Sequence, residues 1–352
     1  MSTRTRLFAG LALAALVTAG LVPAAALVLG SAQAAPQAAP TAATDAVVFT
    51  RVQAPDGDQP DIEVGIWSPA EASPRLRPLI VISHGTGGDF RSHMATAQAL
   101  ARAGFVVAAL THTGDNWRDQ SRSTDLAGRT RQVSALIDFM LTRWDGRAGI
   151  DPRRIGAFGY SAGGFTVLAA AGGRPDLTRM IDHCRTHPDN FDCRLVSQHA
   201  VPAGPAGGNP LAIPTDPRIR ALVVAAPALG FTFAGQGLAA VTQPVQLWQA
   251  GSDQILPAPE YVEPVRAALP NPPEFFRVEG AGHFDFMPPC STELKLFAPA
   301  ICAPTPGFDR AAFHETFGRE VIRFFKAHLA ASSPDAAPVR AGGVNPGRGP
   351  AS

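Results

Sequence analysis

A basic run is absent from this sequence of 352 residues, whose formal net charge is +1. A protein that binds a phosphate backbone needs clustered lysine and arginine, so nucleic-acid binding is not expected. Charged residues make up 17% and hydrophobic residues 46%, which excludes a disordered chain and allows a large buried core. No internal repeat is found either, and single α/β domains of roughly 250–300 residues are common, so one domain is the default.

Charge is missing altogether from residues 7–30, which follow Arg4 and Arg6. A positive start, an apolar stretch and small residues at −3 and −1 of a cleavage site after Ala34 are typical of a secretory signal peptide. An uncleaved anchor is the alternative, because 24 uncharged residues could span a bilayer. The alanine-rich composition favours cleavage, and the two arginines are not adjacent, so a twin-arginine signal is not supported. We expect a signal peptide over 1–34, a secreted or periplasmic protein and no stable membrane anchor.

Cysteine is scarce, with four residues in the chain. Cys184 lies near Cys193 and Cys290 near Cys302, and an even count in an exported chain suggests disulfide bonds. The two local pairings are favoured because each closes a short loop. Zinc is the alternative, since histidines also crowd residues 183–193, but adjacent ligands suit a tetrahedral site poorly and no second ligand pair follows. We therefore expect Cys184–Cys193 and Cys290–Cys302 disulfides and no metal.

Strand-like and helix-like segments alternate beyond an Ala/Pro-rich linker at 35–44. The apolar runs at 78–83 and 105–110 are typical of strands buried on both faces of a parallel sheet. The pattern also predicts strands over 46–52, 61–67, 154–158, 219–225, 245–250 and 274–278, and helices over 92–103, 129–144, 259–268 and 310–329. The alternation indicates an α/β fold with a doubly wound, mostly parallel sheet.

The alternation is interrupted once, at about residues 172–217, where proline, glycine, histidine and two cysteines gather. A segment this long inside a domain is usually a functional insertion, and we expect a lid there. The Ala/Pro/Gly-rich residues 331–352 are expected to be a disordered tail. The folded domain is therefore predicted over 45–330.

The strongest chemical signal is Gly-Tyr-Ser-Ala-Gly at residues 159–163, which places Ser161 between a predicted strand and a helix of small residues. A hydroxyl is a weak nucleophile that needs a fixed, exposed position and a neighbouring base. Glycines on either side allow the sharp strand-to-helix turn that presents such a serine. The motif alone occurs by chance, but its place after a strand favours a nucleophile elbow.

An acyl-transfer site also needs amide N–H groups that stabilise the developing oxyanion. One is expected from Ala162, the residue after the nucleophile. The other is expected from Thr86, in the His-Gly-Thr-Gly-Gly sequence that follows the buried run at 78–83. His84 is expected to brace this loop rather than to act as the base.

The general base and its acid are expected in the order Ser, acid, His along the chain. Asp253 follows the strand at 245–250, and His283 lies in a glycine-rich loop after the last strand. Asp285 is too close to His283 in sequence to orient its ring easily, and two aspartates of the insertion could belong to a lid. His314 and His328 lie on a phenylalanine-bearing helix and are interpreted as packing or surface residues. We therefore predict a Ser161–His283–Asp253 triad.

Four stretches, at 80–88, 111–116, 159–164 and 280–286, resemble the predicted dienelactone hydrolases and, more closely, bacterial relatives of platelet-activating-factor acetylhydrolases. The resemblance extends over about residues 45–330. It implies an α/β-hydrolase fold and an ester hydrolase without a cofactor. Dienelactone hydrolases carry a cysteine nucleophile, whereas this elbow carries serine, and the insertion is not among the shared stretches. Secreted polyester hydrolases and cutinases are similar more loosely.

These residues predict a serine esterase that acts on a small-molecule ester, with Phe90, Trp117 and Tyr160 hypothesised to line its pocket. Ordinary core packing is the alternative for these aromatic residues. A serine peptidase of the prolyl-oligopeptidase type shares the elbow and the triad order, but the sequence offers no propeller-sized N-terminal region. A non-catalytic binding protein on the same scaffold is the third interpretation, which the full set of nucleophile, base, acid and amide donors disfavours.

Overall fold

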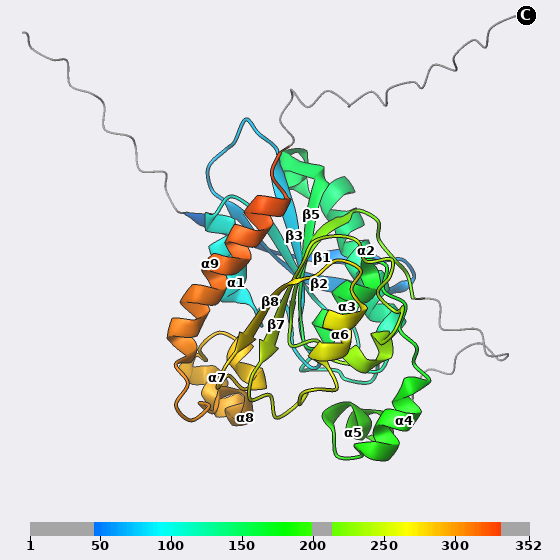
Figure 1. The fold of residues 1–352 in the computed structure, drawn as a ribbon. Coiled ribbons are helices and arrows are strands. Elements are labelled where there is room, and N and C mark those ends of the chain that lie inside the picture. Colours follow the sequence, from blue (N-terminus) through cyan, green and yellow to red (C-terminus); the bar gives the residue numbers. More distant parts are fainter. Residues whose placement is uncertain (1–45, 199–212, 332–352) are drawn as a thin grey trace, which may run out of the picture. The chain divides into compact units, whose positions relative to one another are not determined.

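Eight strands form one mixed sheet in the computed structural model, which describes residues 46–198 and 213–331 (Figure 1). The strand order is β1-β2-β4-β3-β5-β6-β7-β8. The predicted signal peptide, the linker and all but one residue of the predicted tail lie outside the described residues. Within residues 46–198 and 213–331, no helix has both the length and the apolar character that crossing a membrane requires.

Antiparallel pairing is confined to the start of the sheet. β2 pairs antiparallel with both β1 and β4, and every later pair is parallel. The strands are β1 (Val47–Asp56), β2 (Gln59–Pro69), β3 (Arg77–Ser83), β4 (Val106–Thr111), β5 (Ile150–Tyr160), β6 (Ile219–Ala225), β7 (Val245–Ala250) and β8 (Glu274–Val278). The predicted doubly wound, mostly parallel sheet is confirmed. Because β3 to β8 run the same way, the loops that follow them meet at one edge of the sheet.

Helices cover both faces of the sheet (Figure 1). On one face lie α1 (Met94–Arg102) and α9 (Arg310–His328), and on the other α2 (Leu126–Thr142), α3 (Ala162–Ala170) and α6 (Val262–Ala268). Each face has its own apolar cluster, one containing buried residues of α2, α3 and α6 and the other buried residues of α1 and α9.

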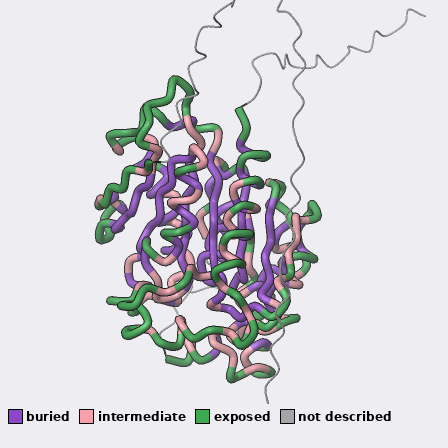
Figure 2. Tube along the Cα trace, turned by 90° about the vertical axis from the view of Figure 1, so that its left-hand side faces the viewer, coloured by how far each residue is buried: buried purple, intermediate pink, exposed green. Residues whose placement is uncertain are grey.

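The apolar run at β3 follows from burial on both faces. Leu79 and Val81 belong to the cluster under α2 and α3, whereas Ile80 and Ile82 belong to the cluster under α1 and α9. Successive side chains of a strand point to opposite faces, so a strand between two helical layers is apolar at every position. Figure 2 shows the buried residues concentrated in the central strands and the exposed ones in the surrounding segments.

The structure extends several predicted elements and adds others. β5 begins at Ile150, four residues before the predicted strand, and a register shift against β3 separates its start from its paired core. α2 begins at Leu126, because Asp125 accepts a hydrogen bond from the Gly128 amide at 2.8 Å and caps the helix.

The described part of the insertion contains two short helices, α4 (Arg179–Thr186) and α5 (Phe191–Gln198). Two more that the sequence did not predict, α7 (Thr292–Phe297) and α8 (Pro299–Cys302), precede α9.

Candidate active site

Ser161 stands at the turn between β5 and α3, with φ 55° and ψ −121°. Residues other than glycine adopt such a positive φ rarely, and where they do it often marks a functional site. The flanking glycines are required by packing. A β-carbon at Gly159 would collide with the Gly163 carbonyl, and one at Gly163 with the Ser83 carbonyl. The predicted Gly-x-Ser-x-Gly turn therefore has the form of a nucleophile elbow.

The turn that follows β6 holds the strained serine in place, a feature that sequence reasoning missed. The Ser161 amide donates to the Ala225 carbonyl at 3.0 Å, and the Ala228 amide donates to the Ser161 carbonyl at 3.0 Å. Ala226 and Leu229 in this turn also have positive φ, 41° and 54°. Neither is glycine, so the sequence contains no signal for this geometry.

Hydrogen bonds join the three residues of the predicted triad, although they come from three separate loops. The Ser161 Oγ lies 3.1 Å from His283 Nε2. On the other side of the ring, Asp253 Oδ2 lies 2.8 Å from His283 Nδ1. A neutral ring with its proton on Nδ1 donates to the carboxylate and accepts the serine hydroxyl proton at Nε2. The side chains of His283 and Asp253 are buried, at 3% and 5% exposure.

Asp253 and Asp285 have different partners, which separates the two candidate acids. The second carboxylate oxygen of Asp253 accepts the amides of Ile255 and Leu256 at 2.9 and 2.7 Å, so the carboxylate is fixed while it contacts the ring. Asp285 instead accepts the Gly282 amide at 2.8 Å and Arg310 Nε at 2.7 Å. Asp285 therefore braces the loop that contains the histidine.

The loop after β3 lies directly against the elbow. A β-carbon at Gly85 would lie 3.1 Å from the β-carbon of Ser161. Ala162 is the first residue of α3, so its amide has no partner within the helix. Among the residues that the structure describes, no acceptor is found for the amide of Thr86 or of Ala162. The assignment of these two amides as oxyanion donors stays a prediction.

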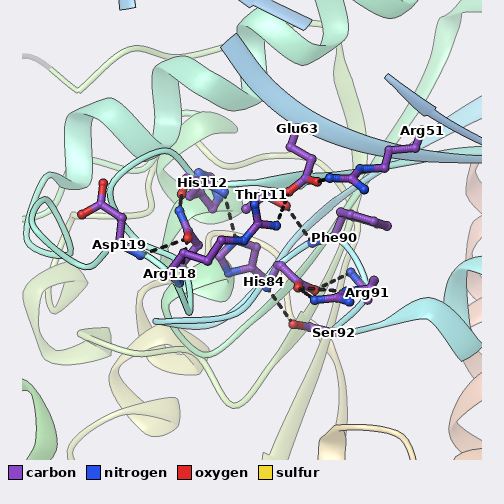
Figure 3. A network of polar contacts seen from close by, with 12 residues as sticks. Arg51, Glu63, His84, Phe90, Arg91, Ser92, Thr111, His112, Arg118 and Asp119 are labelled. Carbon is purple, nitrogen blue, oxygen red and sulfur yellow. Dashed lines mark hydrogen bonds and ion pairs between the residues drawn. The ribbon is translucent and has the colours of Figure 1, made fainter. Parts of the chain in front are cut away.

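Two buried histidines support this loop. His84 Nδ1 lies 2.6 Å from the Gly85 carbonyl, and its Nε2 accepts the His112 amide at 3.0 Å (Figure 3). His112 contacts the Ser83 hydroxyl and the Gln132 side chain, each at 2.8 Å. Burial and the nearby positive charge of Arg129 lower the pKa of His84 to about 3, so the ring stays neutral.

The aromatic residues hypothesised to line the pocket have other positions. Phe90 is buried against Phe49 and Trp67, with ring centroids 6.2 and 6.3 Å away, so it belongs to the core beside β2. Trp117 is 58% exposed, and the Arg118 guanidinium lies 5.0 Å from its ring centre. Tyr160 is buried, and its hydroxyl donates to the His283 carbonyl at 3.0 Å. These contacts show Phe90 packed in the core and Tyr160 bonded to the histidine loop, and a pocket lined by the three aromatic residues stays a prediction. Proximity in sequence to a motif loop did not fix the direction of either side chain.

The four cysteines form the two local disulfides that the sequence predicts, Cys184–Cys193 and Cys290–Cys302. The first joins α4 to α5 in the insertion. His183, Asp192 and Cys193 place potential ligand atoms within 4.8 Å of one another, but the disulfide removes the Cys193 sulfur as a thiolate ligand.

Polar contacts attach the insertion to the rest of the domain. The Tyr261 hydroxyl, at the start of α6, donates to Asp192 at 2.9 Å and lies 3.2 Å from His183 Nε2. The His183 ring stacks on Phe231, with centroids 3.9 Å apart. Tyr261 also packs with Leu256, whose amide holds Asp253, so the insertion lies next to the segment that carries the acid.

Two comparisons with known proteins agree with this architecture. The sequence profile of the Prolyl oligopeptidase family matches residues 91–181, which include Ser161 but neither Asp253 nor His283. The chain is also 32% identical over 113 residues to a protein named Putative esterase NocK from Nocardia uniformis subsp. tsuyamanensis. That alignment covers 30% of this chain and 32% of the relative, so the chain matches about a third of the relative's length. The chain belongs to the α/β-hydrolase superfamily. Members of this superfamily place a serine elbow, an acid and a histidine in this chain order.

Proposed function

We propose that this α/β-hydrolase cleaves carboxylic esters through Ser161, His283 and Asp253. The observation that carries the proposal is the continuous set of hydrogen bonds from the Asp253 carboxylate through the His283 ring to the Ser161 hydroxyl, at 2.8 and 3.1 Å. The name of the esterase relative supports ester substrates.

The proposed reaction is acyl transfer in two steps. His283 Nε2 takes the hydroxyl proton while Ser161 Oγ bonds to the ester carbonyl carbon, and the amides of Thr86 and Ala162 stabilise the oxyanion. The protonated ring then passes its proton to the departing alcohol, which leaves an acyl ester on the serine. A water molecule, deprotonated by the same ring, attacks this ester, and the free acid and the serine are released.

Export is a separate part of the proposal. The signal-like residues 1–34 and the two disulfides of the domain support a secreted or periplasmic enzyme, because disulfides persist in oxidising compartments. N-terminal sequencing of the exported protein is expected to begin near residue 35. A start at the initiator methionine would instead support the uncleaved anchor.

A serine peptidase is the second candidate, favoured by the family match at 91–181. A panel of p-nitrophenyl esters of increasing acyl length, set against proline-containing peptide anilides, separates the two. We expect turnover of short esters, and none in a Ser161→Ala control. Turnover of the anilides alone would favour the peptidase, and turnover of neither class would contradict the proposal.

A further inference from the structure

We propose that a buried ion pair, Asp115 with Arg129, is a positioning element that fixes both halves of the oxyanion hole. The inference rests on the proposed ester hydrolysis and adds two residues to its machinery. Neither side chain contacts the triad. Asp115 lies after β4 and Arg129 on α2, and their side chains are only 1% and 2% exposed.

The pair holds the loop that contains Thr86 from both sides. Asp115 Oδ1 accepts the Gly87 amide at 2.9 Å. Arg129 Nη2 donates to the His84 carbonyl, and Arg129 Nη1 to the second oxygen of Asp115. The peptide groups before and after Gly85–Thr86 are therefore held by one pair of opposite charges, which in a buried site bind more strongly than neutral groups do.

The direction of the Thr86 N–H follows from these contacts. The Gly85 carbonyl accepts His84 Nδ1 at 2.6 Å and the Gly88 amide at 3.1 Å. In a planar trans peptide the C=O of one residue and the N–H of the next point in opposite directions. Holding the Gly85 oxygen therefore aims the Thr86 N–H away from it, provided that His84 Nδ1 bears the proton. The His112 amide ensures this, because its donation to Nε2 leaves the single ring proton on Nδ1. Figure 3 shows the two histidines side by side in this network.

Arg129 is also connected, through Thr166, to Ala162, the other predicted oxyanion donor. Arg129 Nε donates to Thr166 Oγ1 at 3.0 Å, and that hydroxyl donates to the Ala162 carbonyl at 2.8 Å. The first turn of α3, which presents the Ala162 amide, is thus coupled to the loop after β3. A guanidinium can serve three acceptors at fixed angles, whereas a lysine ammonium offers a point charge on a flexible chain.

Stability alone does not account for the pair. Burying two charges carries a large desolvation cost, and apolar replacements for buried ion pairs are often neutral or stabilising. Preorganised donors, by contrast, stabilise a transition state because they need no reorganisation during the reaction. The pair therefore fits a role in aligning the two amides better than a role in stabilising the fold.

The test compares the variants Asp115→Asn and Arg129→Lys with a control variant of a second ion pair, whose arginine lies on the same helix. Arg131 of α2 forms an ion pair with the buried Asp56, and neither side chain forms a hydrogen bond to the described oxyanion loop, so Asp56→Asn is the control. We expect kcat for p-nitrophenyl acetate to fall by about 10- to 100-fold in both test variants while KM changes by less than about 3-fold, since losing one oxyanion donor costs roughly 100- to 1000-fold. Asp56→Asn should keep kcat within about 2-fold even where it lowers the melting temperature.

A second readout separates alignment from folding. Inhibition by a trifluoromethyl ketone, which forms a tetrahedral adduct on the serine, should weaken in the two test variants by the same factor as kcat. If either variant fails to fold, Thr166→Val removes only the branch to Ala162, and a roughly 3- to 10-fold loss of kcat, well below that for loss of a full donor, is expected.

Unchanged kcat and ketone inhibition in the folded variants would overturn the inference, as would an equal loss in Asp56→Asn. Absence of ester turnover in the wild-type enzyme would instead contradict the proposed function.

Discussion

Two regions of this domain are held together by different chemistry. The edge formed by the loops after β3 and β4 contains no cysteine and depends on neutral histidines and the Asp115–Arg129 pair. The insertion helices α4 and α5 and the segment of α7 and α8 are instead closed by disulfides. The predicted triad thus lies on loops at the carboxyl edge of the sheet, whereas the covalent cross-links join the short helices.

The difference suggests a division of tasks. Alignment of a nucleophile and two amides requires fixed geometry, which a buried polar network on the loops and helices beside the core strands can supply. Short helices with few buried residues cannot secure themselves by packing, so cross-links limit their freedom. Each region should therefore respond to its own perturbation, the catalytic edge to loss of a charge or to acid, and the insertion to loss of its disulfide.

The largest effect is expected at the acid of the triad. Asp253→Asn should lower kcat by roughly 1,000- to 10,000-fold, because the amide favours the wrong tautomer of His283. Asp182→Asn, on the exposed face of α4, serves as the control and should leave kcat unchanged. Steady-state kinetics on p-nitrophenyl acetate measure both variants. A loss below about 10-fold in Asp253→Asn would place the acid elsewhere.

Acid should weaken the domain through its buried neutral histidines. Burial lowers the pKa of His93 to about 3, as it does for His84, so between pH 6.5 and 3 the unfolded chain binds protons that the folded chain does not. The free energy of unfolding should therefore fall with decreasing pH across this window, by roughly 1.4 kcal/mol per pH unit for each such histidine.

His93→Phe tests this assignment. Both His93 ring nitrogens lack a hydrogen-bond partner among the described residues, and the ring packs between Phe158 and Tyr160, so phenylalanine removes the titration without losing a hydrogen bond. In urea unfolding at pH 4, 5 and 7, the free energy of unfolding should fall less steeply with decreasing pH than in the wild type. The difference in slope should be roughly 1.4 kcal/mol per pH unit. An identical decline in both proteins would show that His93 is not buried as a neutral ring.

The smallest effect on catalysis is expected from the insertion disulfide. Cys184→Ser with Cys193→Ser should destabilise the insertion locally by about 2–3 kcal/mol and change kcat for p-nitrophenyl acetate by less than about 3-fold. The rate of protease cleavage within α4–α5 and the dependence of turnover on acyl length, each compared with the wild type, measure this local destabilisation. A large loss of kcat would show that the insertion positions the triad.

The second disulfide provides the contrast. Arg310 donates to Asp285 and to the carbonyls of Ile301 and Ala303, so the segment closed by Cys290–Cys302 is connected to the histidine loop. Removal of that disulfide should therefore lower kcat more than removal of the first, since small displacements of reacting groups cost up to about 100-fold. Equal effects of the two removals would contradict this connection between the second disulfide and the histidine loop.

Much of this site could be predicted because its signals are local. The glycines around Ser161 and the strands before Asp253 and His283 are visible in the sequence, and the parallel sheet brings their loops to one edge. The rest depends on packing between distant segments. Arg129 lies on a helix whose apolar spacing predicts only a buried face, and nothing in the sequence indicates that it reaches Asp115. Ala226 and Leu229 adopt positive φ without glycine, and the aromatic Phe90 turned into the core rather than toward the site.

The central claim is that Ser161 is the nucleophile, and covalent labelling tests it most directly. A fluorophosphonate forms a bond between serine oxygen and phosphorus with loss of fluoride, and it requires an activated serine. After reaction and digestion, mass spectrometry should locate one adduct, on the peptide that contains Ser161, and none in Ser161→Ala or in acid-denatured enzyme. An adduct on another serine, or none on folded wild-type protein that is pure and monodisperse, would contradict the account.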